Sequence, residues 1–465
     1  MTIKKILFLF LFLNSTAFAQ QMLGVHASNN MGVYRATFNP SAIAGTKYHF
    51  QINGITLNST INGRYFKYFR SDALFHPFKN PYSQDELYGK SKSTGTLTQG
   101  DKINVISELR GPSAFFNIKD RVSIGFSTRM RGFVQGSGVP QDLSTIYTNR
   151  LDLGTATALN GSFKNMVLNQ QTFFETGVTV AAEVLKISDV LKIKVGGTLK
   201  YLSGARNVFL KINSANYAVR ILNKEEANLD LSNVNYEYGS TNPVQDFSLG
   251  SLYSGSYGSG WGYDLGATVE IGQIKYHEDY RSNYIVRLGA AITDIGSVSY
   301  NTPGKIYSGT INKIVFDQNK IISLYDNSVK GLEATFPKTN PKNYALTTTL
   351  PQTLNLDADV QLVRSFFVNM TLIQPMKADG TLPTTIQQPR FVSLTPRFED
   401  ADAEFSLPIS WIEGNAGPTV GLSARFGPVF IGFSNFSGLL GINEPRSTMV
   451  YLGLNFFKIK RKENQ

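Results

Sequence analysis

The sequence contains no cysteine and only four histidines among its 465 residues. Without cysteine the chain forms no disulfide bond, and four histidines leave little material for a transition-metal site. Beyond residue 19, no stretch reaches the roughly 20 mostly apolar residues that a membrane-spanning helix needs. The mean hydropathy of −0.13 is also too polar for a protein built from such helices. We therefore expect no metal, no cofactor and no bundle of membrane helices.

The N-terminus has the pattern of an exported protein. The first nineteen residues, MTIKKILFLFLFLNSTAFA, contain two lysines, then an apolar run, then an Ala-x-Ala site. This order predicts a secretory signal peptide over residues 1–19, with the mature chain beginning near Gln20. The alternative interpretation is a buried N-terminal helix, which does not require the three parts in this order.

Positive charge exceeds negative charge. The formal net charge is +11, and +9 without the two lysines of the leader. Part of the excess lies in the C-terminal KIKRKENQ. In an exported chain we interpret residues 458–465 as a solvated, basic periplasmic tail. No P-loop, zinc-ligand set or RNA-binding signature accompanies it, so we do not expect a nucleic-acid partner.

Apolar and polar residues alternate with a period of two, which is the pattern of a β-strand with one apolar face. In WGYDLGATVEI at 261–271, aromatic and aliphatic residues fall on one face, and Asp264 and Glu270 fall on the other. The high content of Tyr, Phe and Gly is also typical of a sheet-rich protein. About fourteen such segments occur, near residues 47–58, 104–118, 121–135, 171–186, 190–204, 260–274, 282–299, 351–364, 365–376, 388–399, 403–413, 417–426, 428–436 and 446–457.

The connections between these segments alternate between long and short. The long ones are near 59–103, 136–170, 205–259 and 300–350. With fourteen strands, all the long connections fall at one end of the sheet and both termini at the other. Outer-membrane barrels have this asymmetry, with short periplasmic turns and long outer loops. A soluble β-sandwich or propeller also alternates, but export and one-sided loops favour the barrel.

The sequence therefore predicts an all-β, transmembrane outer-membrane β-barrel of about 14 antiparallel strands, with 16 as the alternative count. The barrel is expected over residues 46–457, with a small N-terminal plug over 20–45 and long extracellular loops. Its apolar faces should contact the lipid of a Gram-negative outer membrane, and both termini should lie in the periplasm.

The polar faces of the predicted strands carry charges of both signs, which should point into the lumen. The candidate ligand-binding residues among them are Arg129, Arg131, Glu175, Asp264, Glu270, Arg287, Asp357, Asp359 and Arg397. One interpretation is a hydrated, ion-paired lumen, because an unpaired buried charge is costly. The other interpretation is a path or binding site for a ligand.

His49 alternates with Gln51 and Asn53, so we expect it on the inner face of the first strand, where a histidine could assist a serine nucleophile. A Ser-His pair needs an orienting third group and an oxyanion site, and no motif here supplies them. We therefore do not expect an enzyme. His26, His76 and His277 are interpreted as surface residues.

The segment before the first strand contains the remaining candidates, Asn39 and Pro40. An Asn-Pro step favours a turn, and proline can begin a short helix. The stretch FNPSAIAG at 38–45 resembles the Asn-Pro-Ala segment near the mature N-terminus of the long-chain fatty-acid transporter family and of related secretion-system barrels, although Ser41 stands at the usual alanine. The resemblance implies a fourteen-stranded barrel with an N-terminal plug.

Two further stretches resemble a family of Bacteroidota outer-membrane barrels whose function is not known. These are LGAAITDIGSVSY at 288–300 and LPQTLNLDADVQL at 350–362. This resemblance runs over most of the mature chain. It implies the barrel fold and gives no indication of an activity.

Two functions of different class are compatible with these features. The first is a diffusion pathway or binding site for a small, amphipathic molecule. The second is a non-transporting envelope scaffold, or an accessory of secretion or assembly, that binds other proteins through its outer loops. The expected partners are outer-membrane lipid, together with lipopolysaccharide or other envelope proteins. An opening lined by apolar residues near the plug would favour the first, and a filled lumen the second.

Overall fold

The fold was analysed in a computed structural model of the chain. The structure describes residues 22–63, 102–118, 121–140, 160–187, 190–221, 227–241, 257–272, 284–300, 304–317, 328–376, 383–413, 415, 417–440 and 447–460. The expected signal peptide, Gln20, His76, His277 and Gln465 lie outside these residues.

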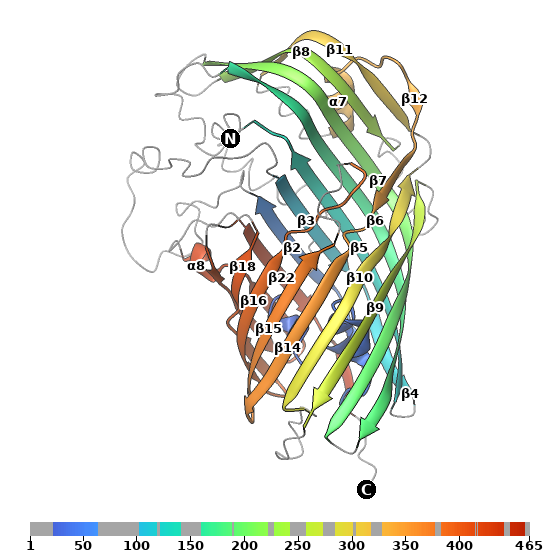
Figure 1. The fold of residues 1–465 in the computed structure, drawn as a ribbon, viewed down its shortest axis with the longest axis vertical. Helices are drawn as coiled ribbons and strands as arrows, with labels where there is room; N and C mark the ends of the chain where they lie inside the picture. Colours follow the sequence, from blue (N-terminus) through green and yellow to red (C-terminus); the bar gives the residue numbers. More distant parts are fainter. Residues whose placement is uncertain are drawn as a thin grey trace.

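Fourteen antiparallel strands close into a barrel (Figure 1). The wall strands in chain order are β1 (Tyr48–Asn53) with β2 (Thr56–Gly63), β3 (Lys102–Arg110) with β4 (Ser113–Ile118), β5 (Val122–Ser137), β6 (Asn160–Ile187), β7 (Leu191–Ile221), β9 (Ser259–Ile271), β10 (Val286–Tyr300), β13 (Leu346–Thr349) with β14 (Thr353–Val363), β15 (Phe366–Pro375), β16 (Phe391–Glu399), β17 (Ala403–Ser406) with β18 (Ile409–Ile412), β19 (Thr419–Val420) with β20 (Leu422–Phe426), β21 (Val429–Phe433), and β22 (Ser447–Leu454) with β23 (Phe457–Lys460). The last wall strand pairs with the first through β22–β2 and β23–β1, which closes the ring. The predicted count of fourteen is confirmed.

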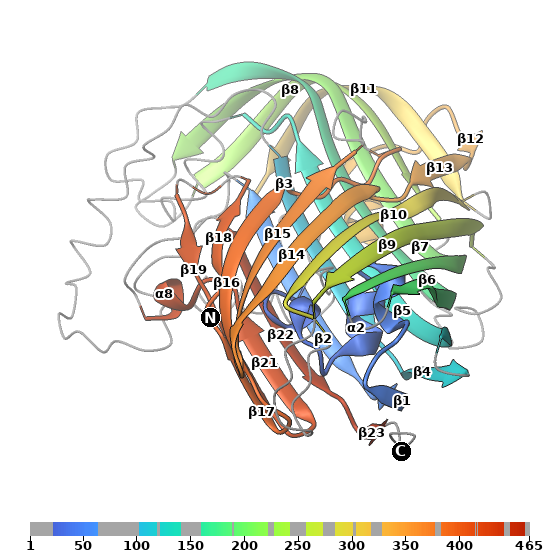
Figure 2. The same cartoon turned by 60° about the horizontal axis from the view of Figure 1, so that its bottom comes forward.

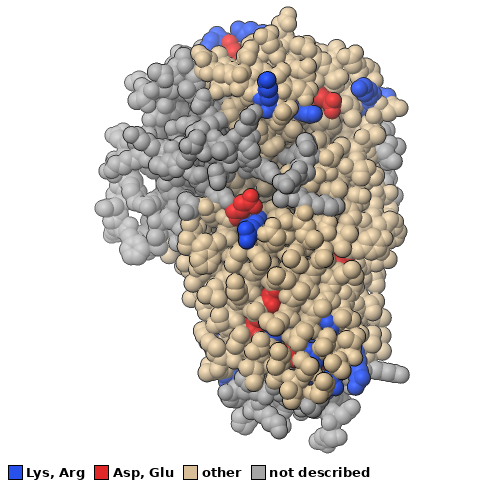
Figure 3. Space-filling view, in the orientation of Figure 1, with Lys and Arg blue, Asp and Glu red and all other residues tan. Residues whose placement is uncertain are grey.

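Closure explains why the strands alternate as they do. Lipid offers no hydrogen-bond partner, so every backbone group in the wall must pair with a neighbouring strand, and one face of each strand meets lipid. In β9, Leu265 is 60% exposed and Trp261 is 53% exposed, whereas Asp264 is 1% exposed. The predicted facing of this strand is confirmed. The wall seen in Figure 3 carries few charged side chains between the two ends of the molecule.

The strand ends that flank the four long connections lie at one rim, as predicted, but two of the expected loops contain regular structure. In 205–259, β7 continues to Ile221 and β8 (Ala227–Ser240) follows. In 300–350 lie β11 (Lys305–Phe316), α7 (Ser328–Thr335), β12 (Lys342–Asn343) and β13. Residues 64–101 and 141–159, which form most of the other two connections, lie outside the described part of the chain.

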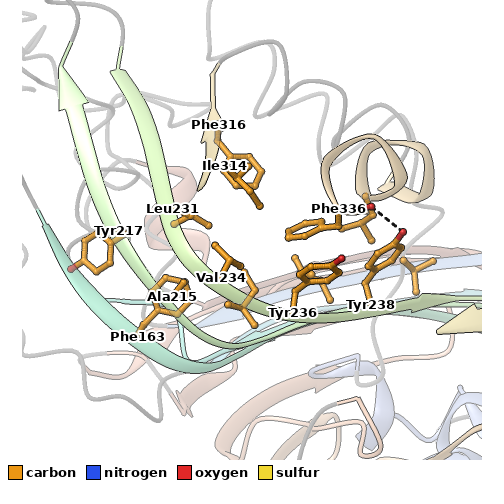
Figure 4. Close-up of a cluster of buried hydrophobic side chains, with 14 of the residues drawn as sticks. Phe163, Ala215, Tyr217, Leu231, Val234, Tyr236, Tyr238, Ile314, Phe316 and Phe336 are labelled. Carbon is orange, nitrogen blue, oxygen red and sulfur yellow. Dashed lines mark hydrogen bonds between the residues drawn. The ribbon is translucent and has the colours of Figure 1, made fainter. Parts of the chain in front are cut away.

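The sheet therefore continues beyond the barrel as a platform, formed by the outer halves of β6 and β7 with β8 and β11. One face of the platform packs under α7, where the Phe336 ring lies 5.0 Å from the Tyr236 ring and Tyr238 donates a hydrogen bond to the Phe336 carbonyl at 3.2 Å (Figure 4). Leu210 belongs to this cluster, and its neighbour Phe209 belongs to a second cluster inside the lumen. Apolar packing on both faces makes the platform part of the folded body.

The N-terminal segment lies inside the barrel, as Figure 2 shows. It consists of η1 (Val25–Ala27), α2 (Gly32–Ala36) and η2 (Pro40–Ile43). The Asn39 side chain caps η2 by accepting a hydrogen bond from the Ser41 backbone N–H at 3.1 Å, and Pro40 occupies the first turn, where its missing N–H is not needed. We call residues 22–45 the plug.

Two features concern the boundaries of the chain. The last strand, β23, reaches Lys460, so residues 458–460 belong to the wall and not to the expected tail; residues 461–465 lie outside the described part. No helix among the described residues is long and apolar enough to cross a membrane.

The facing of β9 predicts unequal effects of two neighbouring substitutions. Leu265→Arg puts a charge on the lipid face, which costs about 2–4 kcal/mol near the bilayer midplane. Asp264→Asn should be milder, because Lys200 keeps Asp294 as a partner at 2.7 Å. The fraction of heat-resistant folded barrel on a gel measures both effects. An equal loss for the two variants would contradict the assigned facing.

Candidate functional site: the plugged, ion-paired lumen

The predicted candidates Asn39 and Pro40 lie in a seat formed by wall glycines. A Cβ atom at Gly196 would lie 2.7 Å from the Pro40 carbonyl carbon, and a Cβ at Gly266 would collide with the Asn39 side chain. Asn39 Nδ2 donates to the Ala267 carbonyl at 3.0 Å. Gly196 and Gly266 face each other across β7 and β9, so the wall is thinned where the plug turn approaches.

One group of predicted lumen charges converges on Asp294, and we call it the Asp294 cluster. Arg131 contacts both carboxylate oxygens of Asp294, at 3.0 and 2.9 Å, and Lys200 contacts Oδ1 at 2.7 Å. Arg129 joins the cluster through Glu175, with Nε to Oε1 at 2.6 Å. Its other members are Glu108, Arg110 and Asp264. Four cations therefore face four anions in the lumen.

A second group surrounds Asp359 and is called the Asp359 cluster. Arg397 contacts both oxygens of Asp359, at 3.3 and 3.1 Å, and Arg287 contacts Oδ2 at 3.4 Å. Tyr284 donates to the same oxygen at 2.6 Å. Arg287 also reaches Asp357 at 3.7 Å. This cluster holds the plug, because Arg287 donates to the Ala27 carbonyl at 3.0 Å.

Two smaller ion pairs complete the set. Glu270 pairs with Lys194 at 2.6 Å. Glu404 pairs with Arg425 at 2.9 Å and also accepts a hydrogen bond from Ser28 of the plug at 2.8 Å. The predicted ion-paired lumen is thus present, and the plug is bonded into it.

The prediction for His49 is wrong. His49 is exposed and points outward, because a bulge between Tyr48 and Phe50 inserts one residue into β1 and reverses the alternation. The interpretation of His26 as a surface residue is also wrong. His26 is 5% exposed within the plug, where its ring is bonded to the Met22 carbonyl at 3.0 Å and to Thr371 at 2.8 Å.

Asp294 is the central lumen residue that the sequence pattern missed. It has a positive φ of 59° at a bulge between Ile292 and Ile295, so simple alternation assigns it to no face. The alternation pattern also did not identify Glu108, Arg110 and Glu399 as members of the lumen ion pairs. For Asp294 a signal was present two residues later at Gly296, since an isolated glycine within a strand pattern indicates a bulge or a close approach of the backbone.

Two small cavities lie between α2 of the plug and the wall strands β4 and β5. The space in them that a water molecule can occupy is about 20 Å³ and 10 Å³, which is room for about one water molecule each. Val33, Thr37, Ser127 and Arg129 line both. The larger is bounded by apolar side chains such as Phe115 on one side and by members of the Asp294 cluster on the other.

A layer of buried apolar side chains lies beyond the Asp294 cluster as seen from the plug, and we call it the outer layer. It consists of Ile106, Phe133, Phe173, Leu202, Phe209, Val298, Tyr300, Tyr344, Leu350 and Ile386. The Phe133 and Phe173 rings stack 5.8 Å apart, and the Arg131 guanidinium lies 5.3 Å and 5.5 Å from their centroids. The described lumen therefore has three levels, which are the plug, the ionic clusters and the outer layer.

The chemistry available here is recognition by charge, amide and apolar contact. Within the described ranges, no group of three or more His, Asp or Glu side chains is placed to hold a metal ion. The Asp294 cluster has equal numbers of positive and negative side chains, so it favours neutral or zwitterionic contacts over a simple anion or cation. In the Asp359 cluster Arg397 also pairs with Glu399 at 3.1 Å, so three anions face two cations.

Removing the charge of Asp294 tests whether the ion pairs hold the barrel together. Asp294→Asn leaves Arg131 and Lys200 with fewer counter-charges in a dry environment, and breaking a buried pair in this way costs about 3–5 kcal/mol. Asp230→Asn is the matched control, because Asp230 pairs with Arg220 and Lys313, which are 51% and 59% exposed. Urea-induced unfolding in detergent micelles should show a large shift for the first and almost none for the second. Similar midpoints would mean that water already screens the Asp294 cluster.

Comparison with solved structures finds other barrels. The Pseudomonas putida toluene transporter TodX is 11% identical, with 95% of this chain and 100% of that chain covered and a TM-score of 0.43. The Ralstonia pickettii toluene transporter TbuX is 10% identical, with 96% of this chain and 100% of that chain covered and a TM-score of 0.39. The translocator domain of the autotransporter NalP from Neisseria meningitidis is 8% identical, with 87% of this chain and 89% of that chain covered and a TM-score of 0.30.

Comparison with curated proteins finds no match. Comparison with protein families gives one, over residues 40–434, which extends from the plug turn to the end of β21. The chain belongs to the family of unknown function DUF5723.

Proposed function

We propose that the protein is a gated diffusion pathway for a small amphipathic molecule across the outer membrane, closed here by its plug. The observation that carries the proposal is the pair of cavities between α2 and the wall, whose lining combines apolar side chains such as Val33 with charged side chains such as Arg129. A molecule with one apolar and one polar end matches such a lining.

The way in which the plug is held supports a gate. The wall strands bond to one another around the ring, so the barrel does not depend on the plug for its backbone hydrogen bonds. The plug is joined to the wall through side chains and not by strand pairing, in many hydrogen bonds such as Ser28 to Glu404 and Ser41 Oγ to Thr268 Oγ1 at 2.6 Å, and by apolar packing. Movement of the plug would widen the cavities without opening the sheet.

The proposal assigns an orientation. The short turns, the plug and both termini would face the periplasm, and the platform would face outward into the lipopolysaccharide layer. Lipopolysaccharide and outer-membrane lipid are then the surroundings of the barrel, and the molecule that passes is the ligand.

A second candidate is an envelope scaffold, and the platform favours it. β7 runs for 31 residues, whereas a strand needs about 9–11 to cross the hydrocarbon core. The excess carries a sheet with a packed core on each face and a helix docked on it. A structure of this kind outside the membrane suits contact with other envelope proteins.

Deleting residues 22–40 tests the pathway. Removal of the plug should leave a folded barrel and raise its conductance in planar bilayers, because the lumen is widened at the level of the plug while the ionic clusters stay fixed to the wall. Heat-resistant migration on a gel reports folding. A folded deletion variant that conducts no more than the intact protein would shift the preference to the scaffold.

The cysteine-free chain allows a reversible control. Ser41→Cys with Thr268→Cys should form a disulfide, because the two hydroxyl oxygens lie 2.6 Å apart. If the plug is the gate, the oxidised variant should show no channel openings in planar bilayers, and the reduced variant should show the same openings as the intact protein. Each single-cysteine variant should behave like the intact protein. Openings that persist in the oxidised, cross-linked barrel would rule out the plug as the gate.

A substitution that weakens the packing of α7 on the platform tests the scaffold proposal. Phe336→Asp removes the ring that packs on Tyr236, and the barrel wall below should remain folded. If the platform binds envelope proteins, chemical cross-links formed in intact cells should be lost in this variant and kept in Asp230→Asn. Identical cross-link patterns in both variants would exclude the α7 face as the contact surface.

A further inference from the structure

A segment of the chain is bound inside the lumen at the outer layer. Residues 383–388 follow β15 and precede β16, and Thr385, Ile386, Gln387 and Gln388 are all buried. Ile386 is 1% exposed, and it packs among the inward aromatic residues of the outer layer. A connection that stayed on the rim would leave these side chains in solvent.

The backbone of this segment is held in the way that a sheet holds an added strand. Thr385 forms a parallel bridge with Thr349. The Thr349 N–H donates to the Thr384 carbonyl at 2.9 Å, and the Ile386 N–H donates to the Thr349 carbonyl at 3.2 Å. Main-chain bonds of this kind recognise an extended peptide independently of its side chains.

The side-chain amide of Gln135 binds the backbone of the next residue, Gln387. Gln135 Nε2 donates to the Gln387 carbonyl at 2.7 Å, and Gln135 Oε1 accepts from the Gln387 N–H at 3.4 Å. One carboxamide therefore satisfies both backbone groups of one residue. Asn104 fixes the Gln135 amide by accepting from its Nε2 at 2.8 Å.

Two further amides on the same wall have no hydrogen-bond partner among the residues that the structure describes. Asn169 faces Gln135 across the β5–β6 ladder, and Gln171 follows on the same face of β6. They are 2% and 0% exposed, and none of their four side-chain nitrogen and oxygen atoms has a hydrogen bond within the described residues. Buried amides without partners are costly unless something else binds them.

We infer that the outer lumen is a binding site for an extended peptide with an aliphatic residue, occupied here by the chain's own residues 384–387. The aliphatic side chain takes the position of Ile386, and Gln135 reads the peptide group that follows. The unpaired amides Asn169 and Gln171 extend the site beyond its present occupant. A ligand longer than this segment therefore satisfies groups that the internal segment leaves free.

The surroundings also define which peptides fit. The cation nearest the aromatic rings, Arg131, is engaged by both oxygens of Asp294. A charged side chain at the Ile386 position would find no free counter-ion among the described residues of the outer layer. The ligand is thus an uncharged, extended segment with a β-branched or other aliphatic residue. This inference goes beyond the proposed pathway and does not require the plug to move.

The internal segment competes with any external peptide. It is tethered at both ends, so its effective concentration at the site is high, in the millimolar range for short flexible tethers. An external peptide should therefore bind the intact barrel weakly. Ile386→Asp should expel the internal segment, because it buries a carboxylate in the outer layer, and so free the site.

The test uses the full barrel in detergent and a fluorescein-labelled peptide, PTTIQQP, which is the sequence of residues 383–389. We expect the Ile386→Asp barrel to bind this peptide at least tenfold more tightly than the intact barrel in fluorescence anisotropy. The peptide with Asp in place of Ile should bind neither. Adding Gln135→Met to Ile386→Asp should weaken binding at least tenfold. Heat-resistant migration verifies folding, and Ile386→Ala gives the same direction with a smaller factor if the Asp variant does not fold.

The unpaired amides give a second, independent arm. An eleven-residue peptide with PTTIQQP at its centre and two serines at each end should bind the freed site at least fivefold more tightly than the seven-residue peptide. Asn169→Leu with Gln171→Met should abolish that advantage and leave the shorter peptide unaffected. The inference is overturned if the folded Ile386→Asp and Ile386→Ala barrels bind neither peptide, or if binding is indifferent to Gln135.

Discussion

Closure of the sheet in lipid is the constraint from which the rest of the structure follows. Because lipid accepts no hydrogen bonds, the backbone of the wall is paired from strand to strand, and alternate side chains are forced inward. The inward charges then have to neutralise one another, which they do around Asp294 and Asp359. The plug is bonded to these same groups, through Arg287 and Glu404. Fold, lumen chemistry and plug are therefore consequences of one requirement.

The sequence predicted those features that depend on strict alternation, and it failed where the alternation is interrupted. Strand number and the facing of β9 follow from a period of two, and the structure confirms both. A single bulge turned His49 outward, and another hid Asp294. The long connections predict loop where the structure has β8 and β11, although Leu231, Tyr236 and Tyr238 are buried along β8. No local pattern could reveal the partners of His26, since its burial depends on contacts with a strand 345 residues away.

The three levels of the lumen differ in how they are attached, and this difference suggests their roles. The ionic clusters belong mainly to the wall strands, so they are as permanent as the barrel. The plug and the segment 383–388 are folded into the lumen outside the pairing of the wall strands; the plug is held by many side-chain hydrogen bonds and apolar contacts, and the segment by fewer. Elements of this kind open at lower free energy than the sheet that surrounds them. In the proposed pathway the wall supplies a fixed lining of ion pairs, and the plug and the segment 383–388 are the elements that can move.

The central claim is that the plug is a separable element within a permanent wall, and hydrogen–deuterium exchange on the intact barrel in nanodiscs measures this directly. Peptides from wall strands such as β6 and β9 should stay protected to the longest times. Peptides covering residues 31–44 should exchange orders of magnitude faster, through an opening that leaves the wall protected. If the plug and the wall lose protection together and at the same rate, the plug leaves only when the barrel unfolds, and the account of a gated lumen is wrong.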